Sequence, residues 1–199
     1  MLAMPSGGTV CSQTVACLLA LFDRSRQPEY GINPFFSIQI GNFSPHNKNK
    51  MVEIAKEQKA THMLIIDPDM VFPDWGLLQL LEDDKDIVGA NYNMRGQHDT
   101  QEVRISTVKF TDKQGNYIPK AAKDIPKQLF ECAGLGTGFM LIKMSVFDKL
   151  EKPYFVLRED ADGQLYTADM NFCKAAVAAG FKVWCDPTIG MGHIGQYNY

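Results

Sequence analysis

The chain has 199 residues, enough for one domain with a sizeable core. Hydrophobic residues make up 45% and charged residues 22%, as in ordinary globular proteins, which argues against a disordered or fibrous chain. The net charge of -3 gives no overall signal for binding to nucleic acid or membranes. Five cysteines without a CxxC pair favour a reduced, cytoplasmic protein.

The N-terminal stretch MLAMPSGGTVCSQTVACLLALF is the best candidate for a targeting segment. It lacks a basic n-region, and polar residues interrupt its apolar part, so it does not match a secretory signal peptide. No apolar run approaches the length of a membrane span. The sequence therefore predicts a cytoplasmic protein with no transmembrane segment.

The first half of the chain alternates between strand and helix patterns. Strands are predicted at residues 2–4, 35–40, 63–66 and 86–90, and helices from Thr9 or Ser12 to about Asp23, at 50–59 and at 75–81. Residues 5–8 are predicted as a turn, and Asp74 as the cap of the third helix. Alternation of this kind indicates a parallel sheet covered by helices.

The second half is less regular. Strands are predicted at 103–110, 117–118, 128–132, 138–143 and 183–185, a turn at 114–116, and a loop at 158–164. Ser145 is predicted to cap a short helix ending at Leu150, and Thr167 a longer helix at 168–179 that Gly180 ends. The glycine-rich segment 134–138 brings backbone close to a ligand or to another part of the chain, or forms a simple bend.

Two carboxylates follow the apolar run at 63–66, in the sequence Asp67-Pro68-Asp69. Open α/β sheets place their sites at the carboxyl ends of strands, so both side chains are expected at a cleft. Hard oxygen ligands one residue apart on a stiff turn suit Mg²⁺ or Mn²⁺, a metal usually shared with substrate phosphates. In the alternative interpretation, the two aspartates only cap the helix that follows.

Two further features accompany this pair: Asp169 in the first turn of a late helix, and His193 between two glycines. Together with the glycine-rich segment, they resemble the metal-dependent, nucleotide-sugar glycosyltransferases of the GT-A fold, and more narrowly the small family-2-like members of bacteria and phages. The resemblance covers most of the chain. The matching segments are NKMVEIA (49–55), MLIIDPDMVFP (63–73), DIVGANYNMR (86–95), GTGFMLIKMSVFDKL (136–150) and ADMNFCKAAVAAGFKVWCDPTIGMGHIG (168–195).

The resemblance implies one α/β, GT-A-like (Rossmann-like) domain over residues 1–199, with a central mixed, mostly parallel sheet flanked by helices. It implies a nucleotide-sugar-binding half at 1–95 and an acceptor-binding half at 96–199. The implied activity moves a sugar from a nucleoside diphosphate sugar, with UDP as first expectation, to an acceptor hydroxyl. Direct displacement inverts the anomeric centre.

The resemblance also assigns roles to individual residues. Asp67 and Asp69 would hold Mn²⁺ or Mg²⁺ against the donor diphosphate, His193 would be a further metal ligand, and Asp169 would be the general base. The residues expected at the donor are Pro5, Ser6, Lys48, Asn49, Asp67 and Arg95, and those expected at the acceptor or sugar are Gly136, Thr137 and Gly138. Lys48 stands where relatives usually carry arginine, and Ala168 where they carry an acidic residue.

Other interpretations stay open on the same residues. An apolar strand followed by Asp-x-Asp also resembles the first motif of haloacid-dehalogenase-like phosphatases, with Asp67 as nucleophile and Asp69 as acid/base. The chain also fits a nucleotide- or glycan-binding module without turnover. Asp169 could be only a helix N-terminal charge, and His193 a structural loop histidine. The acceptor class stays open among glycan, lipid, protein and modified DNA base.

Overall fold

Strands from both halves of the chain form one seven-stranded sheet in the computed structural model, which describes residues 1–94, 105–113, 116–159, 163 and 165–195. Arg95, the start of the strand predicted at 103–110 and most of the predicted turn at 114–116 lie outside these residues. Across the sheet, the order is β2 (Phe36–Ile40), β1 (Leu2–Ser6), β3 (His62–Ile66), β9 (Phe139–Lys143), β5 (Ile87–Ala90), β12 (Val183–Asp186) and β8 (Phe130–Cys132).

The sheet is mixed, as predicted. β1 pairs in parallel with β2 and β3, and β12 pairs in parallel with β5. β9 runs antiparallel between β3 and β5, and β8 is antiparallel to β12. Three of the six pairings are therefore antiparallel, so parallel pairing does not dominate as expected. The reason is the insertion of β9, from the second half of the chain, into the sheet built by the first half.

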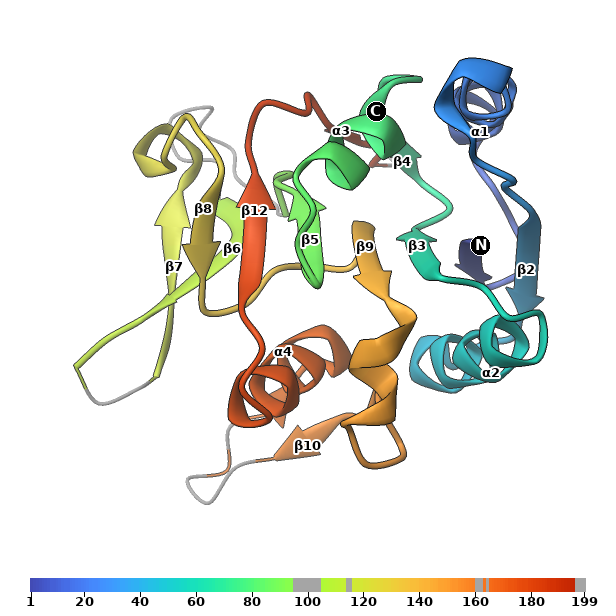
Figure 1. Ribbon diagram of the computed structural model, residues 1–199. Coiled ribbons are helices and arrows are strands. Elements are labelled where there is room, and N and C mark those ends of the chain that lie inside the picture. The colour runs from blue at the N-terminus through green and yellow to red at the C-terminus, as the bar shows by residue number, and fades with distance from the viewer. Residues whose placement is uncertain (95–104, 114–115, 160–162, 164, 196–199) are drawn as a thin grey trace.

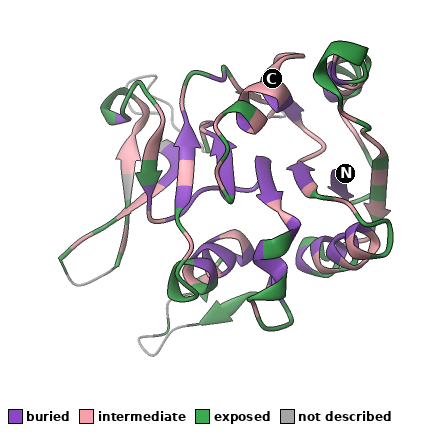
Figure 2. Cartoon of the chain, in the orientation of Figure 1, coloured by how far each residue is buried: buried purple, intermediate pink, exposed green. Residues whose placement is uncertain are grey.

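Helices cover both faces of the sheet. Figure 1 shows α1 (Ser12–Ser25) and α3 (Gly76–Glu82) above it, and α2 (Ser44–Glu57) and α4 (Ala168–Ala178) below it. Two buried clusters correspond to these two layers. Met51 and Phe172 belong to the lower cluster, and Leu21 and Leu80 to the upper one. The strands at the middle of the sheet are the most buried, whereas the edge strand β2 is largely exposed (Figure 2).

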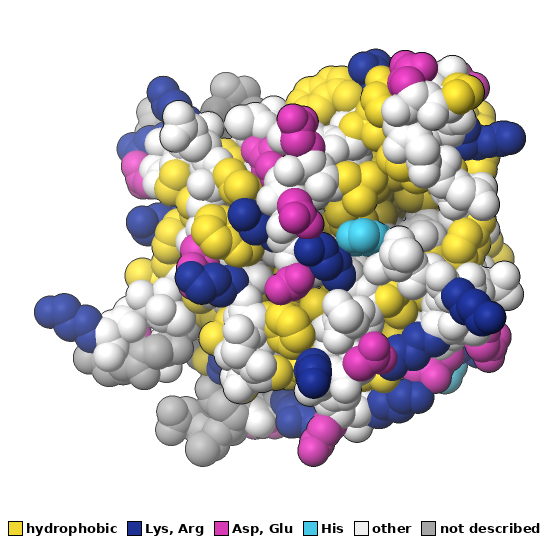
Figure 3. Space-filling model, viewed as in Figure 1, with side chains coloured by type: hydrophobic (Ala, Val, Ile, Leu, Met, Phe, Trp, Pro, Cys, Tyr) yellow, Lys and Arg dark blue, Asp and Glu magenta, His cyan; other side chains and the backbone are white. Residues whose placement is uncertain are grey.

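The upper layer is less complete than the lower one. Figure 3 shows hydrophobic side chains gathered between α1 and α3 and visible from outside. Leu18 and Phe22 of α1 and Trp75 beside α3 are only partly buried against the upper cluster. None of the helices in the described part of the chain has the length and apolar character needed to cross a bilayer.

Several helix boundaries differ from the prediction. α2 begins at Ser44, before the predicted start at residue 50, because a proline suits the first turn of a helix, where its missing N–H costs nothing. Asp74 does not cap α3; its carboxylate pairs with Arg24 at 3.1 Å. Ser145 does not cap a helix either, since it lies inside a 3₁₀ helix, η3 (Met144–Asp148). The helix at α4 is confirmed, with the Thr167 hydroxyl accepting the N–H of Met170.

The remaining differences concern short strands. Pro5 and Ser6, predicted in a turn, are the last two residues of β1. The predicted loop at 158–164 contributes β10 (Arg158–Glu159), which pairs with β11 (Leu165–Tyr166). The strands β4 (Met70–Val71) and β13 (Gly192–His193) were not predicted, because two residues are too few to show a period. The other elements are β6 (Ile105–Thr111), β7 (Tyr117–Ala121), η1 (Pro28–Tyr30) and η2 (Ala122–Asp124).

Candidate active site

The Asp67-Pro68-Asp69 turn leaves the carboxyl end of β3, as predicted, and the chain fixes it from two sides. The N–H of Asp67 donates to the carbonyl of Gly138 at 3.0 Å. The carbonyl of Pro68 accepts the N–H of Cys11, just before α1, at 2.8 Å. The turn is therefore anchored to β9 and to α1, which holds its backbone at a defined place on the sheet edge.

The C-terminal segment returns to this turn. β13 pairs antiparallel with β4, the strand that directly follows Asp69, with His193 opposite Met70. The N–H of Ile194 donates to the carbonyl of Asp69 at 2.9 Å. As a result, Nε2 of His193 lies 3.6 Å from Oδ1 of Asp69, and the two side chains are 19% and 21% exposed. The predicted proximity of His193 to the Asp-x-Asp turn is thus found.

The imidazole of His193 is oriented by its other nitrogen. Nδ1 lies 2.9 Å from the carbonyl oxygen of Asn93, which can only accept, so Nδ1 is the donor in this hydrogen bond. Nε2 is the ring nitrogen that faces Asp69. The ring of Tyr92 meets the imidazole edge-on, with centroids 5.3 Å apart. A backbone carbonyl that fixes the tautomer in this way is typical of metal-ligating histidines.

Carboxylate and imidazole groups are common ligands of divalent cations, but two of them do not surround an ion. Within the ranges that the structure describes, no three His, Cys, Asp or Glu side chains gather closely enough to hold a metal. Mg²⁺ and Mn²⁺ are usually bound through one or two carboxylates together with waters and substrate phosphates. Asp69 and His193 are therefore two of the several ligands that such a cation needs.

A second charged centre lies at the start of α4. Nζ of Lys48 donates to Oδ1 of Asp169 at 2.6 Å and to Oγ1 of Thr137 at 2.5 Å. The N–H of Thr137 donates to the other carboxylate oxygen, Oδ2, at 3.2 Å. Burial alone would raise the pKa of Asp169, but the charge and hydrogen bond of Lys48, with the donors of Thr137, bring that pKa below its ordinary value. Asp169 is therefore a carboxylate at neutral pH.

Neighbouring residues of one segment join the two centres. Thr137 contacts Asp169, and the next residue, Gly138, accepts the N–H of Asp67. Consecutive Cα atoms are about 3.8 Å apart, so the base candidate and the Asp-x-Asp turn are held against the same short stretch of backbone. Through these contacts and the pairing of β13 with β4, Asp67, Asp169 and His193 lie near the same end of β3 and β9.

Tyr92 is the residue at this site to which no role was assigned from the sequence. It is buried, and its hydroxyl oxygen accepts the N–H of Gly138 at 2.9 Å. A Cβ at Gly136 or Gly138 would run into this ring, so the two glycines serve the close approach of Tyr92. Burial, and then the charges of Asp67 and Asp169, raise the pKa of Tyr92, so its hydroxyl stays protonated. The sequence signal that could have indicated this role is the position of Tyr92, an aromatic residue just after the buried strand β5.

The expected donor residues on β1 are placed at its carboxyl end. Ser6 is buried, and its hydroxyl donates to the carbonyl of Thr9 and accepts the N–H of Gly8. The side chain of Ser6 therefore builds the turn between β1 and α1. Pro5 is buried beside Gln39 of β2.

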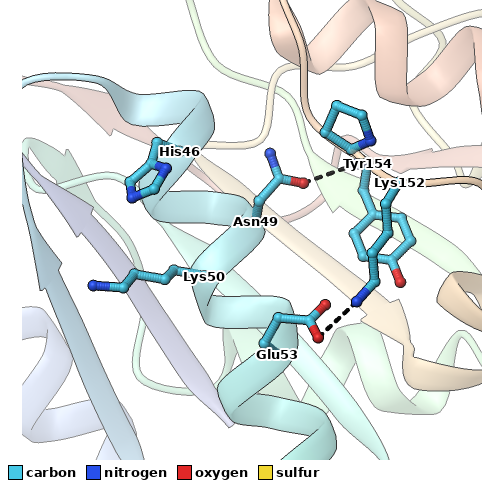
Figure 4. Close-up of a pocket in the computed structure, with 7 residues that line it drawn as sticks. His46, Asn49, Lys50, Glu53, Lys152 and Tyr154 are labelled. Carbon is cyan, nitrogen blue, oxygen red and sulfur yellow. Dashed lines mark hydrogen bonds and ion pairs between the residues drawn. The ribbon is translucent and has the colours of Figure 1, made fainter.

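Asn49 makes contacts away from Lys48, although the two are consecutive on α2. Its Nδ2 donates to the carbonyls of Pro45 and Phe155 at 2.8 and 2.7 Å, and its Oδ1 accepts the N–H groups of Tyr154 and Phe155. Figure 4 shows Asn49 pointing from α2 towards Tyr154. The amide of Asn49 is thus engaged in holding the 154–155 segment against α2.

Two hollows lie elsewhere on the surface. The one in Figure 4, about 270 Å³, lies between α2 and the segment after Lys152, where Lys152 pairs with Glu53 at 2.8 Å. The other, about 610 Å³, is lined by β8, α4 and the hairpin of β6 and β7. Neither hollow includes the acidic residues or His193 of the candidate site.

The same fold occurs in the crystal structure of A197 from STIV. That protein is 17% identical over 98% of this chain and 85% of its own, with a TM-score of 0.64, which shows a shared fold and no more. HddC from Yersinia pseudotuberculosis, 8% identical over 96% of this chain and 92% of its own, has a TM-score of 0.46, too low to carry an argument. The sequence matches no protein-family model and no curated protein.

Proposed function

We propose that this chain is a metal-dependent glycosyltransferase that moves a sugar from a nucleoside diphosphate sugar to an acceptor hydroxyl. One observation carries the proposal: a pre-oriented imidazole faces Asp69, while an ionised carboxylate, Asp169, is held against the same Thr137–Gly138 backbone. The first centre offers cation ligands and the second a proton acceptor. In the proposed reaction, the cation stabilises the diphosphate leaving group and the carboxylate accepts the proton of the attacking hydroxyl.

At the donor end, Asp69 and His193 would hold Mn²⁺ or Mg²⁺, and Asp67 is fixed beside them by Gly138. The cation supplies Lewis-acid stabilisation of the negative charge that grows on the leaving diphosphate. Without a cation, the carboxylates would repel that diphosphate. Pro5 and Ser6, at the end of β1, are proposed beside the nucleoside, and Arg95 is proposed as a further donor contact.

At the acceptor end, Asp169 would remove the proton from the attacking hydroxyl. Its side chain is 20% exposed, so an acceptor can reach it, and its lowered pKa keeps it ionised. Direct attack from this side inverts the anomeric centre. Ala168, which replaces an acidic residue of the relatives, is buried, so its side chain lies within the packed interior, whereas Asp169 remains partly open to solvent.

A donor screen tests the proposal. The purified chain is incubated with nucleoside diphosphate sugars and Mn²⁺, with glycan, lipid, protein and DNA acceptors in parallel, and released nucleoside diphosphate is measured. Calorimetry with UDP, first with Mn²⁺ and then with EDTA, tests the metal. Equal affinity in both conditions would refute the metal bridge. Nucleotide binding without turnover would identify a binding module, and hydrolysis of a generic phosphate ester that is lost in Asp67→Asn would identify a phosphatase.

A further inference from the structure

Lys48 was expected to contact the donor phosphates, but its ammonium is directed elsewhere. Its side chain is 5% exposed, and its Nζ has two oxygen partners from the chain itself, on Asp169 and Thr137. The ring of Phe155 lies 5.8 Å from the same nitrogen. An ammonium has three N–H donors, so little of this group is left for a phosphate arriving from solution.

We propose that Lys48 is the positioning residue of Asp169: its buried ammonium holds the carboxylate in the geometry needed to receive a proton. This inference rests on the proposed function. The exposed fractions support it, since the Asp169 side chain is 20% exposed and that of Lys48 only 5%, so an acceptor reaches the carboxylate more readily than the ammonium. Each carboxylate oxygen has its own donor, Lys48 for Oδ1 and the Thr137 N–H for Oδ2, so the plane of the carboxylate is defined as well as its place.

The charge of Lys48 has a second effect at the site. Burial would lower the pKa of Lys48, but Asp169 and then Asp67 raise it, so the ammonium stays charged under the influence of both carboxylates. It therefore reduces the repulsion between the base and the metal-binding turn. The other titratable groups around Asp169 are Tyr92 and Cys173, whose pKa values burial raises, to about 12 for Cys173, so both are neutral at working pH.

The test compares Lys48→Met with Lys50→Met, a matched control two residues further along α2 whose side chain is exposed and lines the separate hollow of Figure 4. For Lys48→Met we expect the donor KM to stay within about threefold and kcat to fall roughly 100-fold, the loss that a small misplacement causes. We also expect the acidic limb of the kcat–pH profile to move to higher pH, because Asp169 is then buried without its cation. Lys50→Met should match the wild type.

Lys48→Arg keeps the positive charge but changes the shape of the side chain, so it tests charge and position separately. It also provides the test if Lys48→Met does not fold. It should leave the acidic limb in place while lowering kcat less than Lys48→Met does, with the donor KM unchanged. A rise of tenfold or more in donor KM with kcat intact, in either variant, would overturn the inference and show that Lys48 binds the donor. An unmoved acidic limb in folded Lys48→Met would also overturn it. If the wild type releases no nucleotide with any donor and acceptor, the proposed function itself fails, which is a distinct result.

Discussion

The two centres of the candidate site differ in how closely their paired side chains approach each other. Asp69 and His193 are separated by 3.6 Å and are about equally exposed, and Nδ1 of His193 bonds to the Asn93 carbonyl instead of the carboxylate. Lys48 and Asp169 are in contact at 2.6 Å, and the ammonium is almost fully buried. The first pair is the looser of the two, because its nitrogen and oxygen lie beyond hydrogen-bond distance. The second is a direct, charged hydrogen bond that holds the Asp169 carboxylate in one place.

The largest expected effect comes from Asp169→Asn, which removes the proton acceptor and keeps the shape. We expect kcat to fall roughly 10²–10⁴-fold, the usual range for a lost general base, with UDP affinity nearly unchanged. Asp148→Asn is the control, because this carboxylate pairs with Lys56 on the exposed surface. Transfer at the normal rate by Asp169→Asn would mean that the base is another residue and that Asp169 only complements the start of α4.

His193→Ala tests the other centre. We expect the affinities for Mn²⁺ and for UDP to fall together, by roughly 100-fold. Loss of an outer-shell partner of a metal site already lowers metal affinity by up to about that factor. His46→Ala, an exposed histidine on α2, should bind as the wild type does. Calorimetry in EDTA should give the same weak UDP affinity for all three proteins. Normal Mn²⁺-dependent UDP binding by His193→Ala would assign His193 to the packing of the tail.

The contrast between the two centres also separates what the sequence could predict from what it could not. The buried runs at 63–66 and 183–185 have enough apolar residues to be recognised as strands, and an Asp-x-Asp after such a run implies a sheet-edge site. The pairing of Lys48 with Asp169 joins positions 121 residues apart. No local pattern encodes that contact, and a lysine on a polar helix turn looks solvent-exposed in the sequence.

The tail illustrates the same limit. His193 was a metal-ligand candidate only through resemblance, because β13 and β4 have two residues each and are specified by pairing with each other. The role of Tyr92 depends on a backbone that must lack Cβ atoms at Gly136 and Gly138. A glycine-rich segment indicates in the sequence that another group packs closely against the backbone, but it does not identify Tyr92 as that group.

Asn49→Ala sharpens the comparison between adjacent residues of α2. Its amide makes four hydrogen bonds to backbone groups of Pro45, Tyr154 and Phe155. Leaving some of these groups unpaired should lower the free energy of unfolding by about 2 kcal/mol, measured by urea denaturation, with donor KM unchanged. Lys50→Ala, on the exposed side of the helix, is the control. Unaltered stability together with a raised donor KM would instead support the donor contact expected from the sequence.

The smallest expected effect comes from Gly138→Ala, which tests the backbone that connects the two centres. A Cβ at this position would lie 2.7 Å from the Tyr92 ring, so the ring or the start of β9 must shift. We expect a loss of about 1–2 kcal/mol in unfolding free energy, within the range for overpacking of a core. Gly190→Ala is the matched control, because a Cβ there meets no atom within 4 Å and should change stability by less than about 0.5 kcal/mol. Since Gly138 also accepts the N–H of Asp67, the same shift should weaken Mn²⁺-dependent UDP binding in Gly138→Ala and leave it intact in Gly190→Ala. If Gly138→Ala were as stable and bound UDP as tightly as Gly190→Ala, Tyr92 would not be the reason for the glycine, and the link between the two centres would not pass through this residue.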